Sequence, residues 1–109
     1  MIDKVKRKLQ LSFIHLHVLY HASKSPFYGA WMLEELKSHG YDFGPSTIYP
    51  LLKEMTDSTL LAVKKQIVSG KLRKYYSITE QGLELLNESI HQVNILLNEI
   101  GEKHHEKDI

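Results

Sequence analysis

The sequence of 109 residues contains no cysteine, so disulfides and thiolate metal sites are excluded and a reducing compartment is the expected location. It also lacks a long apolar run, because His15, His17 and His21 interrupt the apolar stretch that follows the basic N-terminus. We therefore expect no signal peptide, no membrane span and no membrane partner, and a cytoplasmic protein. Net charge is small as well: 14 Lys and Arg nearly balance 13 Asp and Glu, and the total of +1 indicates no class of partner.

Motifs of familiar catalytic chemistry are also missing. The sequence has no HExxH pair, no glycine-rich loop that could cradle a phosphate and no nucleophile elbow. The scattered Asp, Glu and His residues suggest no convergent arrangement. We predict that the protein is not an enzyme and needs no cofactor.

The charge that is present is segregated along the chain. Residues 62–76 carry five basic side chains and no acid, a local charge of +5. Residues 80–109 carry seven acids against two lysines, a local charge of −5. A length of 109 residues with 42% apolar composition allows one domain with one core. Within such a domain, the basic segment favours a face for nucleic acid.

Apolar spacing predicts helices in the first half of the chain. Residues 9–20 are apolar on almost every side, which is typical of a helix buried between other elements. A second helix is predicted at about 29–38. Gly40 follows its end, at a position where the backbone is often left-handed and glycine adopts that conformation most easily. The basic residues before position 9 could form either a DNA-touching arm or a solvated helix start.

A third helix is predicted at about 46–58. Its apolar residues recur at i, i+3, i+4 and i+7 and define one face: Ile48, Leu51, Leu52 and Met55. With Ser46 as the N-cap, Pro50 is the fourth helical residue, and its missing N–H would have bonded only the cap carbonyl. The proline is then compatible with the helix.

The second half predicts a hairpin and a long helix. Between about residues 60 and 78, two segments rich in apolar and basic residues flank Ser69-Gly70-Lys71. This pattern indicates two strands joined by a short turn. Thr79 is the predicted N-cap of the last helix. Six apolar residues of that helix form a heptad seam with spacings of 3 and 4: Leu83, Leu86, Ile90, Val93, Leu97 and Ile100. Packing within one subunit could explain the seam, but so long a helix has few partners in a small domain, and we predict dimerisation.

The order of these elements predicts a mainly α fold with a small β-hairpin, a winged helix-turn-helix with a C-terminal dimerisation helix. Residues 1–79 would form the DNA-binding domain, with a recognition helix at about 46–58 and a wing at about 60–78. Residues 80–109 would form the dimerisation helix and a solvated tail that includes His104 and His105.

Three segments of the chain resemble the PadR family of bacterial winged-helix transcriptional regulators, in its short-tailed form. They are PFYGAWMLEEL (26–36), GPSTIYPLLKEM (44–55) and SGKLRKYYSITEQGLELL (69–86), and the resemblance covers about residues 9–90. It implies a repressor-like regulator that binds DNA as a dimer through its C-terminal helix, with an inducer site near the first and last helices. The chain departs from the family at Ala30, where a second Tyr is usual, and at Thr59, where a left-handed Gly is usual.

The predicted function is a sequence-specific DNA-binding regulator, a ligand-responsive homodimeric repressor of an operator in double-stranded DNA. Hydroxyl and cationic side chains suited to phosphate and base edges are the predicted contacts: Tyr28, Ser46, Thr47, Tyr49, Lys53, Lys64, Lys71, Arg73 and Lys74, with Lys65 in the same basic segment. Helix capping and ordinary solvated surface are the alternative roles for these residues. The alternative function is a winged-helix module that binds protein or ligand without binding DNA; a neutralised wing or a truncated last helix would favour it, and the sequence has neither.

Aromatic residues and histidines of the first two helices are candidates for a small-molecule site. The candidate wall of a pocket for a small hydrophobic or aromatic inducer is Phe13, His17, Tyr20 and Trp31, for which core or interface packing is the alternative. His17 and His21 are four residues apart, as in some metal sites. A zinc site needs a third ligand and a second shell, which the sequence does not supply nearby. We therefore predict no metal.

Overall fold

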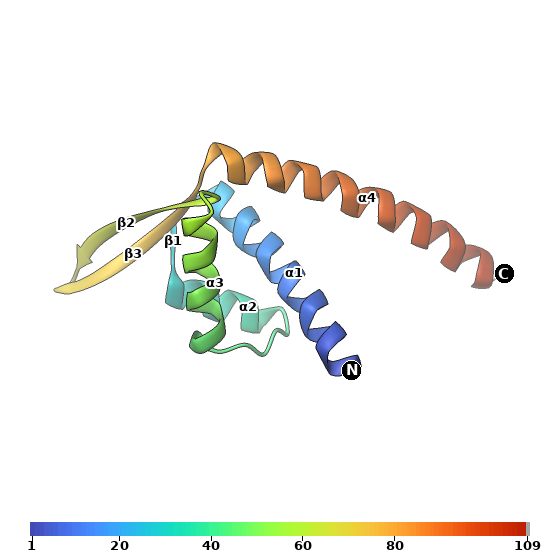
Figure 1. Cartoon of the computed structure of the whole chain (residues 1–109), viewed down its shortest axis with the longest axis horizontal. Helices are drawn as coiled ribbons and strands as arrows, with labels where there is room; N and C mark the ends of the chain where they lie inside the picture. The colour runs from blue at the N-terminus through green and yellow to red at the C-terminus, as the bar shows by residue number, and fades with distance from the viewer. Residues whose placement is uncertain (109) are drawn as a thin grey trace.

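The computed structural model describes the backbone of residues 1–108 and the side chains of residues 1–101 (Figure 1). The elements in chain order are α1 (Ile2–Lys24), β1 (Phe27–Tyr28), α2 (Gly29–Ser38), α3 (Pro45–Asp57), β2 (Leu61–Val68), β3 (Lys71–Ile78) and α4 (Glu80–Asp108). The predicted mainly α fold with a small β-hairpin is confirmed. The predicted tail, with His104 and His105, lies outside the residues whose side chains are described.

The core lies where α1, α2 and α3 meet the base of the sheet. The apolar face predicted for α3 is buried there, with Ile48 and Leu52 fully inaccessible to solvent. Every other element also contributes, and the remaining core residues are Ile14, Val18, Leu19, Ala22, Phe27, Met32, Leu36, Leu51, Met55, Leu61, Tyr76 and Leu86. α1 is longer than predicted, since its basic first turns are helical and solvent-exposed.

The start of α3 differs from the prediction. Gly44, not Ser46, is the N-cap, and its carbonyl accepts hydrogen bonds from the backbone N–H groups of Thr47 and Ile48, each at 3.1 Å. Pro45 occupies the first helical position, where its fixed φ is already helical and its missing N–H is not needed. Pro50 is therefore the sixth residue of the helix and lies inside it. Because proline has no backbone N–H, the Ser46 carbonyl lacks the helical hydrogen bond that it would otherwise accept from position 50.

The sheet contains the predicted hairpin and one strand that was not predicted. Ser69 and Gly70 form a two-residue turn with φ of 52° and 78°, the positive values that suit a hairpin whose strands twist to the right. β1 pairs with β3 on the side opposite β2, so the strand order is β1-β3-β2 and all pairs are antiparallel. β1 has only two residues, and its pairing with a strand almost fifty residues away leaves no local pattern in the sequence.

The end of α3 is joined closely to the start of α4. Thr59 adopts the left-handed conformation expected there, with φ of 61°. The Thr79 hydroxyl donates to the Thr59 carbonyl at 2.5 Å and accepts from the Gly82 N–H at 3.0 Å, which confirms its predicted role as a cap of α4. Gly82 packs directly on the Leu60 carbonyl, so that a Cβ at this position would collide with the backbone.

The molecule is elongated because α4 projects from the helical body. Figure 1 shows α1 and α4 diverging from a common junction while the β2–β3 hairpin projects on the other side. The radius of gyration is 16.3 Å, against about 13 Å for a compact domain of this length. Among the described residues, no helix has both the length and the apolar composition to cross a membrane.

Candidate nucleic-acid interface

A broad groove separates α3 from the β2–β3 hairpin, which we call the wing. Its volume is about 940 Å³, and its lining includes the first turn of α2 and Tyr76. α3 contributes Tyr49, Pro50 and Lys53 from its polar face, because the opposite face is held in the core. We call this space the basic groove, after the four cationic side chains that line it: Lys53, Lys65, Arg73 and Lys74.

The alternation of the strands divides the basic residues of the wing between its two faces. Lys65 lies directly opposite Lys74 in the antiparallel register, so both side chains point to the same face, which borders the groove. Lys64 and Lys71 belong to the other face. Arg73 also belongs to that face, yet it reaches the edge of the groove, where its guanidinium carbon lies 4.4 Å from the centroid of the Tyr28 ring.

The wing cations have no acidic partner among the residues whose side chains are described. Within the described part of the chain, none of the five basic side chains of the wing takes part in a salt bridge. Their charges are therefore available to an external anion. Several cations held on a rigid hairpin are suited to the phosphates of a nucleic acid backbone.

Lys53 differs from the wing cations because it already has a partner. Its ammonium group donates to Asp57, one turn further along α3, at 2.8 Å. This hydrogen bond, together with the charge of Asp57, raises the pKa of Lys53 above its usual value. Since both side chains are exposed, a phosphate could exchange with the carboxylate at little cost.

Tyr49 is held in place by the start of α2. Its ring lies against Gly29, so closely that a Cβ at position 29 would collide with it. The ring is 41% exposed and borders the groove, next to Tyr76. Burial, with a smaller contribution from Tyr49, raises the pKa of the Tyr76 hydroxyl.

The remaining predicted contacts lie around the groove. Ser46 is exposed and Thr47 half-buried in the first turn of α3, outside the lining of the groove. Tyr28 lines it. The lining also includes Pro50 and Val63, which were not predicted as contacts. The two-residue turn could have predicted which wing residues share a face of the hairpin. It fixes the cross-strand register and therefore the pairing of Lys65 with Lys74.

Residues 18–88 match the model of the transcriptional regulator PadR-like family. The chain belongs to this family. It is 34% identical over 100 residues to the transcriptional regulator Rv3488 of Mycobacterium tuberculosis, a match that covers 90% of this chain and 94% of that protein. The family is one of transcriptional regulators and not of enzymes.

Solved structures of PadR proteins have the same architecture. A PadR family transcriptional regulator from Eggerthella lenta superposes with a TM-score of 0.78 at 29% identity, covering 93% of this chain and 89% of that one. A PadR-like transcriptional regulator from Bacillus cereus gives a TM-score of 0.79 at 29% identity, covering 87% and 94%. The predicted winged helix-turn-helix is confirmed by these similarities.

A second groove of this PadR-family chain lies between α1 and α4. Its volume is about 510 Å³, and we call it the apolar groove because Leu16, Leu86, Ile90 and Val93 form much of its wall. Three of the predicted pocket residues, Phe13, His17 and Tyr20, line it as well.

Trp31, the fourth predicted pocket residue, does not line the apolar groove. Its ring lies edge-on to His21, with centroids 5.2 Å apart, and close to Phe27. The α2 face that carries Trp31 therefore contacts α1 and β1 instead of the groove.

Proposed function

We propose that this PadR-like regulator is a homodimeric repressor that binds operator DNA through α3 and the wing. The observation that carries the proposal is the basic groove. Wing cations that have no acidic partner in the described part of the chain line one side of it, and the polar face of α3 forms the other. In this arrangement the first turns of α3 approach base edges, while the wing holds the phosphate backbone. Ser46, Thr47 and Tyr49 are then the candidates for contact with bases or neighbouring phosphates.

The two faces of the wing would have different tasks. Lys65 and Lys74 border the groove and would hold the strand next to α3, whereas Lys64 and Lys71 would meet phosphates beyond the hairpin. Arg73 is oriented by its stacking on Tyr28. The Tyr28 ring would thus act by positioning a cation, in addition to any contact of its own hydroxyl.

Dimerisation through α4 is supported by the apolar surface that this helix leaves exposed. Leu97 is 58% exposed, and Leu83, Ile90 and Ile100 are also exposed. Val93 is half-buried. Leu86 is the exception among the predicted seam residues: it is buried in the core of its own subunit, since it is near the junction with α1. A second copy of the chain would cover the remaining seam.

An inducer of hydrophobic or aromatic character would occupy the apolar groove beside Phe13 and Tyr20. Because α4 forms one wall of the groove and would also form the dimer interface, a ligand there could change the spacing of the two recognition helices. Such a ligand must bind one dimer geometry more tightly than the other, since equal affinity for both shifts no equilibrium.

The DNA-binding proposal can be tested with the DNA upstream of the protein's own gene. Fluorescence anisotropy at several salt concentrations should detect binding whose logarithm of affinity falls linearly with the logarithm of salt concentration. Lys74→Ala should reduce the magnitude of the slope by about 0.9 for each phosphate that the variant no longer neutralises. Lys37→Ala, which removes an exposed cation of α2 outside the groove, is the matched control and should leave the slope unchanged.

Two results would contradict the proposal. Absence of binding to that DNA and to genomic fragments at low salt would favour the alternative of a winged-helix module without DNA binding. Equal slopes for Lys74→Ala and Lys37→Ala would instead remove the basic groove as the binding surface.

A further inference from the structure

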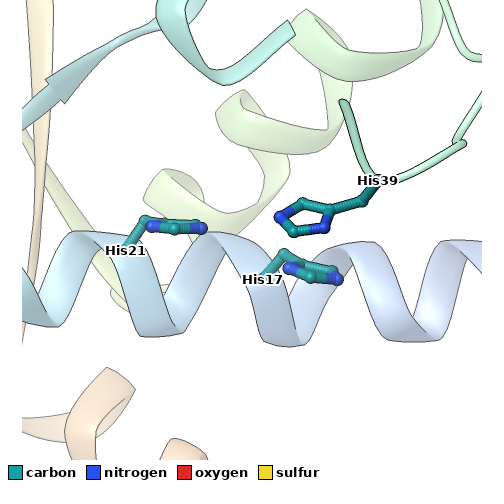
Figure 2. Close-up of side chains that lie close together, drawn as sticks. All are labelled: His17, His21 and His39. Atoms are coloured by element: carbon teal, nitrogen blue, oxygen red, sulfur yellow. The ribbon is translucent and has the colours of Figure 1, made fainter. Parts of the chain in front are cut away.

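The fold brings together three histidines that are dispersed in the sequence. His17 and His21 are one turn apart on α1, and His39 follows the last residue of α2 (Figure 2). Each residue offers a ring nitrogen, and these three nitrogens lie within 4.8 Å of one another. Their rings also stack, with centroids 4.9 Å apart for His17 and His39 and 6.3 Å apart for His17 and His21.

The cluster is only partly exposed to solvent. His17 and His21 are half-buried, and His39 is exposed at the end of its helix. Burial lowers the pKa of His17, and the neighbouring His39 and His21 lower it further. A neutral imidazole has the free lone pair that a metal ion needs.

A carboxylate completes the surroundings. The oxygens of Glu35, on α2, lie 3.6 Å from Nε2 of His39 and 4.0 Å from Nε2 of His21. Carboxylates beside metal-bound histidines orient the rings and increase their basicity. The structure therefore supplies a third imidazole and a neighbouring carboxylate, neither of which the sequence places near His17.

We propose that His17, His21 and His39 bind one divalent metal ion of the zinc class. Three imidazoles suit Zn²⁺, Ni²⁺, Co²⁺ or Cu²⁺ and do not suit Mg²⁺ or Ca²⁺, which prefer oxygen ligands. Zinc lies about 2.0 to 2.1 Å from histidine nitrogens, so the rings must move closer together on binding. The His39 side chain is exposed, which leaves it room to change rotamer.

The position of the site leaves part of the metal's coordination shell open. His17, His21 and His39 all line the apolar groove between α1 and α4. Three protein ligands leave the fourth position of a tetrahedral zinc ion to water or another ligand. A water or another small ligand at that position would complete the site.

Histidines elsewhere in the chain provide matched controls. Nδ1 of His15 is 2.6 Å from the Leu11 carbonyl of its own helix, and His91 is exposed on α4. His104 and His105 are adjacent in the sequence and could bind metal by themselves, so they require their own variant.

The experiment uses the full chain, produced without a histidine tag and treated with a chelator. Zn²⁺ alone is titrated by calorimetry, and Co²⁺ alone is titrated by its visible absorption, which reports the geometry of its ligands. We expect one ion per chain. His39→Ala should weaken binding at least about tenfold. Glu35→Gln should weaken it about 10- to 100-fold, as expected of a carboxylate that orients the ligating rings. His15→Ala, His91→Ala and the double variant His104→Ala/His105→Ala should bind as the parent does.

Absence of zinc binding by the parent chain would overturn the proposal. So would unchanged binding by His39→Ala, or loss of binding in the His104→Ala/His105→Ala variant. Circular dichroism establishes whether each variant is folded. If His39→Ala is unfolded, Glu35→Gln decides the outcome, and equal zinc affinities of Glu35→Gln and the parent would then refute the site. None of these measurements depends on DNA binding.

Discussion

Helices α3 and α4 are both amphipathic, but they use their apolar faces in opposite ways. α3 has 13 residues, and four of them are buried in the core of the subunit. α4 has 29 residues, and among those with described side chains its buried apolar residue is Leu86. The polar face of α3 is consequently presented to solvent beside the wing, while α4 presents its apolar residues.

The difference shows how one small domain can offer two kinds of binding surface. A helix that is anchored by its apolar face holds its polar side chains in fixed positions, which favours recognition of a charged, regular ligand such as DNA. A helix with exposed apolar surface is stabilised when another apolar surface covers it and removes it from water. Four substitutions test this contrast between α3 and α4, in order of decreasing effect.

Leu52→Ala should produce the largest loss of stability. Leu52 is fully buried in α3, so removal of its side chain leaves a cavity and should cost about 2 to 5 kcal/mol of unfolding free energy. Leu96→Ala, at a position of α4 that is 53% exposed, is the control and should have little effect on folding of the subunit. Urea denaturation measures both. Similar losses at the two positions would erase the distinction between the helices.

Leu97→Glu should separate the proposed dimer. Two copies of Leu97 would be buried across the seam, and their loss should cost about 3 kcal/mol, at about 1.5 kcal/mol for each side chain. That is about a hundredfold increase in the dissociation constant of the dimer. Sedimentation should show a monomer at concentrations where the parent is a dimer. Gln92→Glu adds the same charge outside the seam and should remain dimeric; a monomeric parent chain would remove the proposal altogether.

Gly82→Ala tests the joint between the two helices. Alanine favours a helix interior by about 1 kcal/mol over glycine. At this position, however, its Cβ would collide with the Leu60 carbonyl, so we expect a net loss of about 1 to 3 kcal/mol. Gly101→Ala, where a Cβ meets no neighbour, is the matched control within the same helix. Thermal unfolding distinguishes them, and a stabilised Gly82→Ala chain would show that α4 does not pack closely on the end of α3.

Thr59→Gly should have the smallest effect, and it should stabilise the protein. Thr59 has φ of 61°, and a non-glycine residue in this conformation costs about 1 to 2 kcal/mol. Glycine removes that strain but gains freedom in the unfolded chain, so we expect a net stabilisation of about 0.5 to 1 kcal/mol. Ser58→Gly, at φ of −86°, lacks the strain and should destabilise slightly. A destabilised Thr59→Gly chain would contradict this explanation.

Local patterns were sufficient for much of the fold. Helical spacing identified the buried face of α3, and positive φ at Gly40 and Thr59 agrees with the predicted helix ends. Capping residues were less dependable: Ser46 was expected to cap α3, but Pro45 begins the helix and Gly44 caps it. Several residue types can serve as a cap, so the choice between neighbouring positions depends on the path of the preceding chain.

Contacts between distant segments account for the rest. β1 is defined by its pairing with β3, and the orientation of Tyr49 depends on its contact with Gly29. The burial of Leu86, which takes it out of the predicted seam, depends on where α4 meets the other elements. In each of these cases the partner is remote in the chain, so periodicity gives no information about it.

The sequence by itself determined the helices, the hairpin and the basic segment of this PadR-like regulator, because helical and strand periodicity and charge are local properties of the chain. Only the tertiary structure decided which cations share the basic groove, which apolar residues of α4 stay exposed, and that His39 joins His17 and His21. Those outcomes depend on how the helices cross and how the strands pair. The packing of the whole core fixes both.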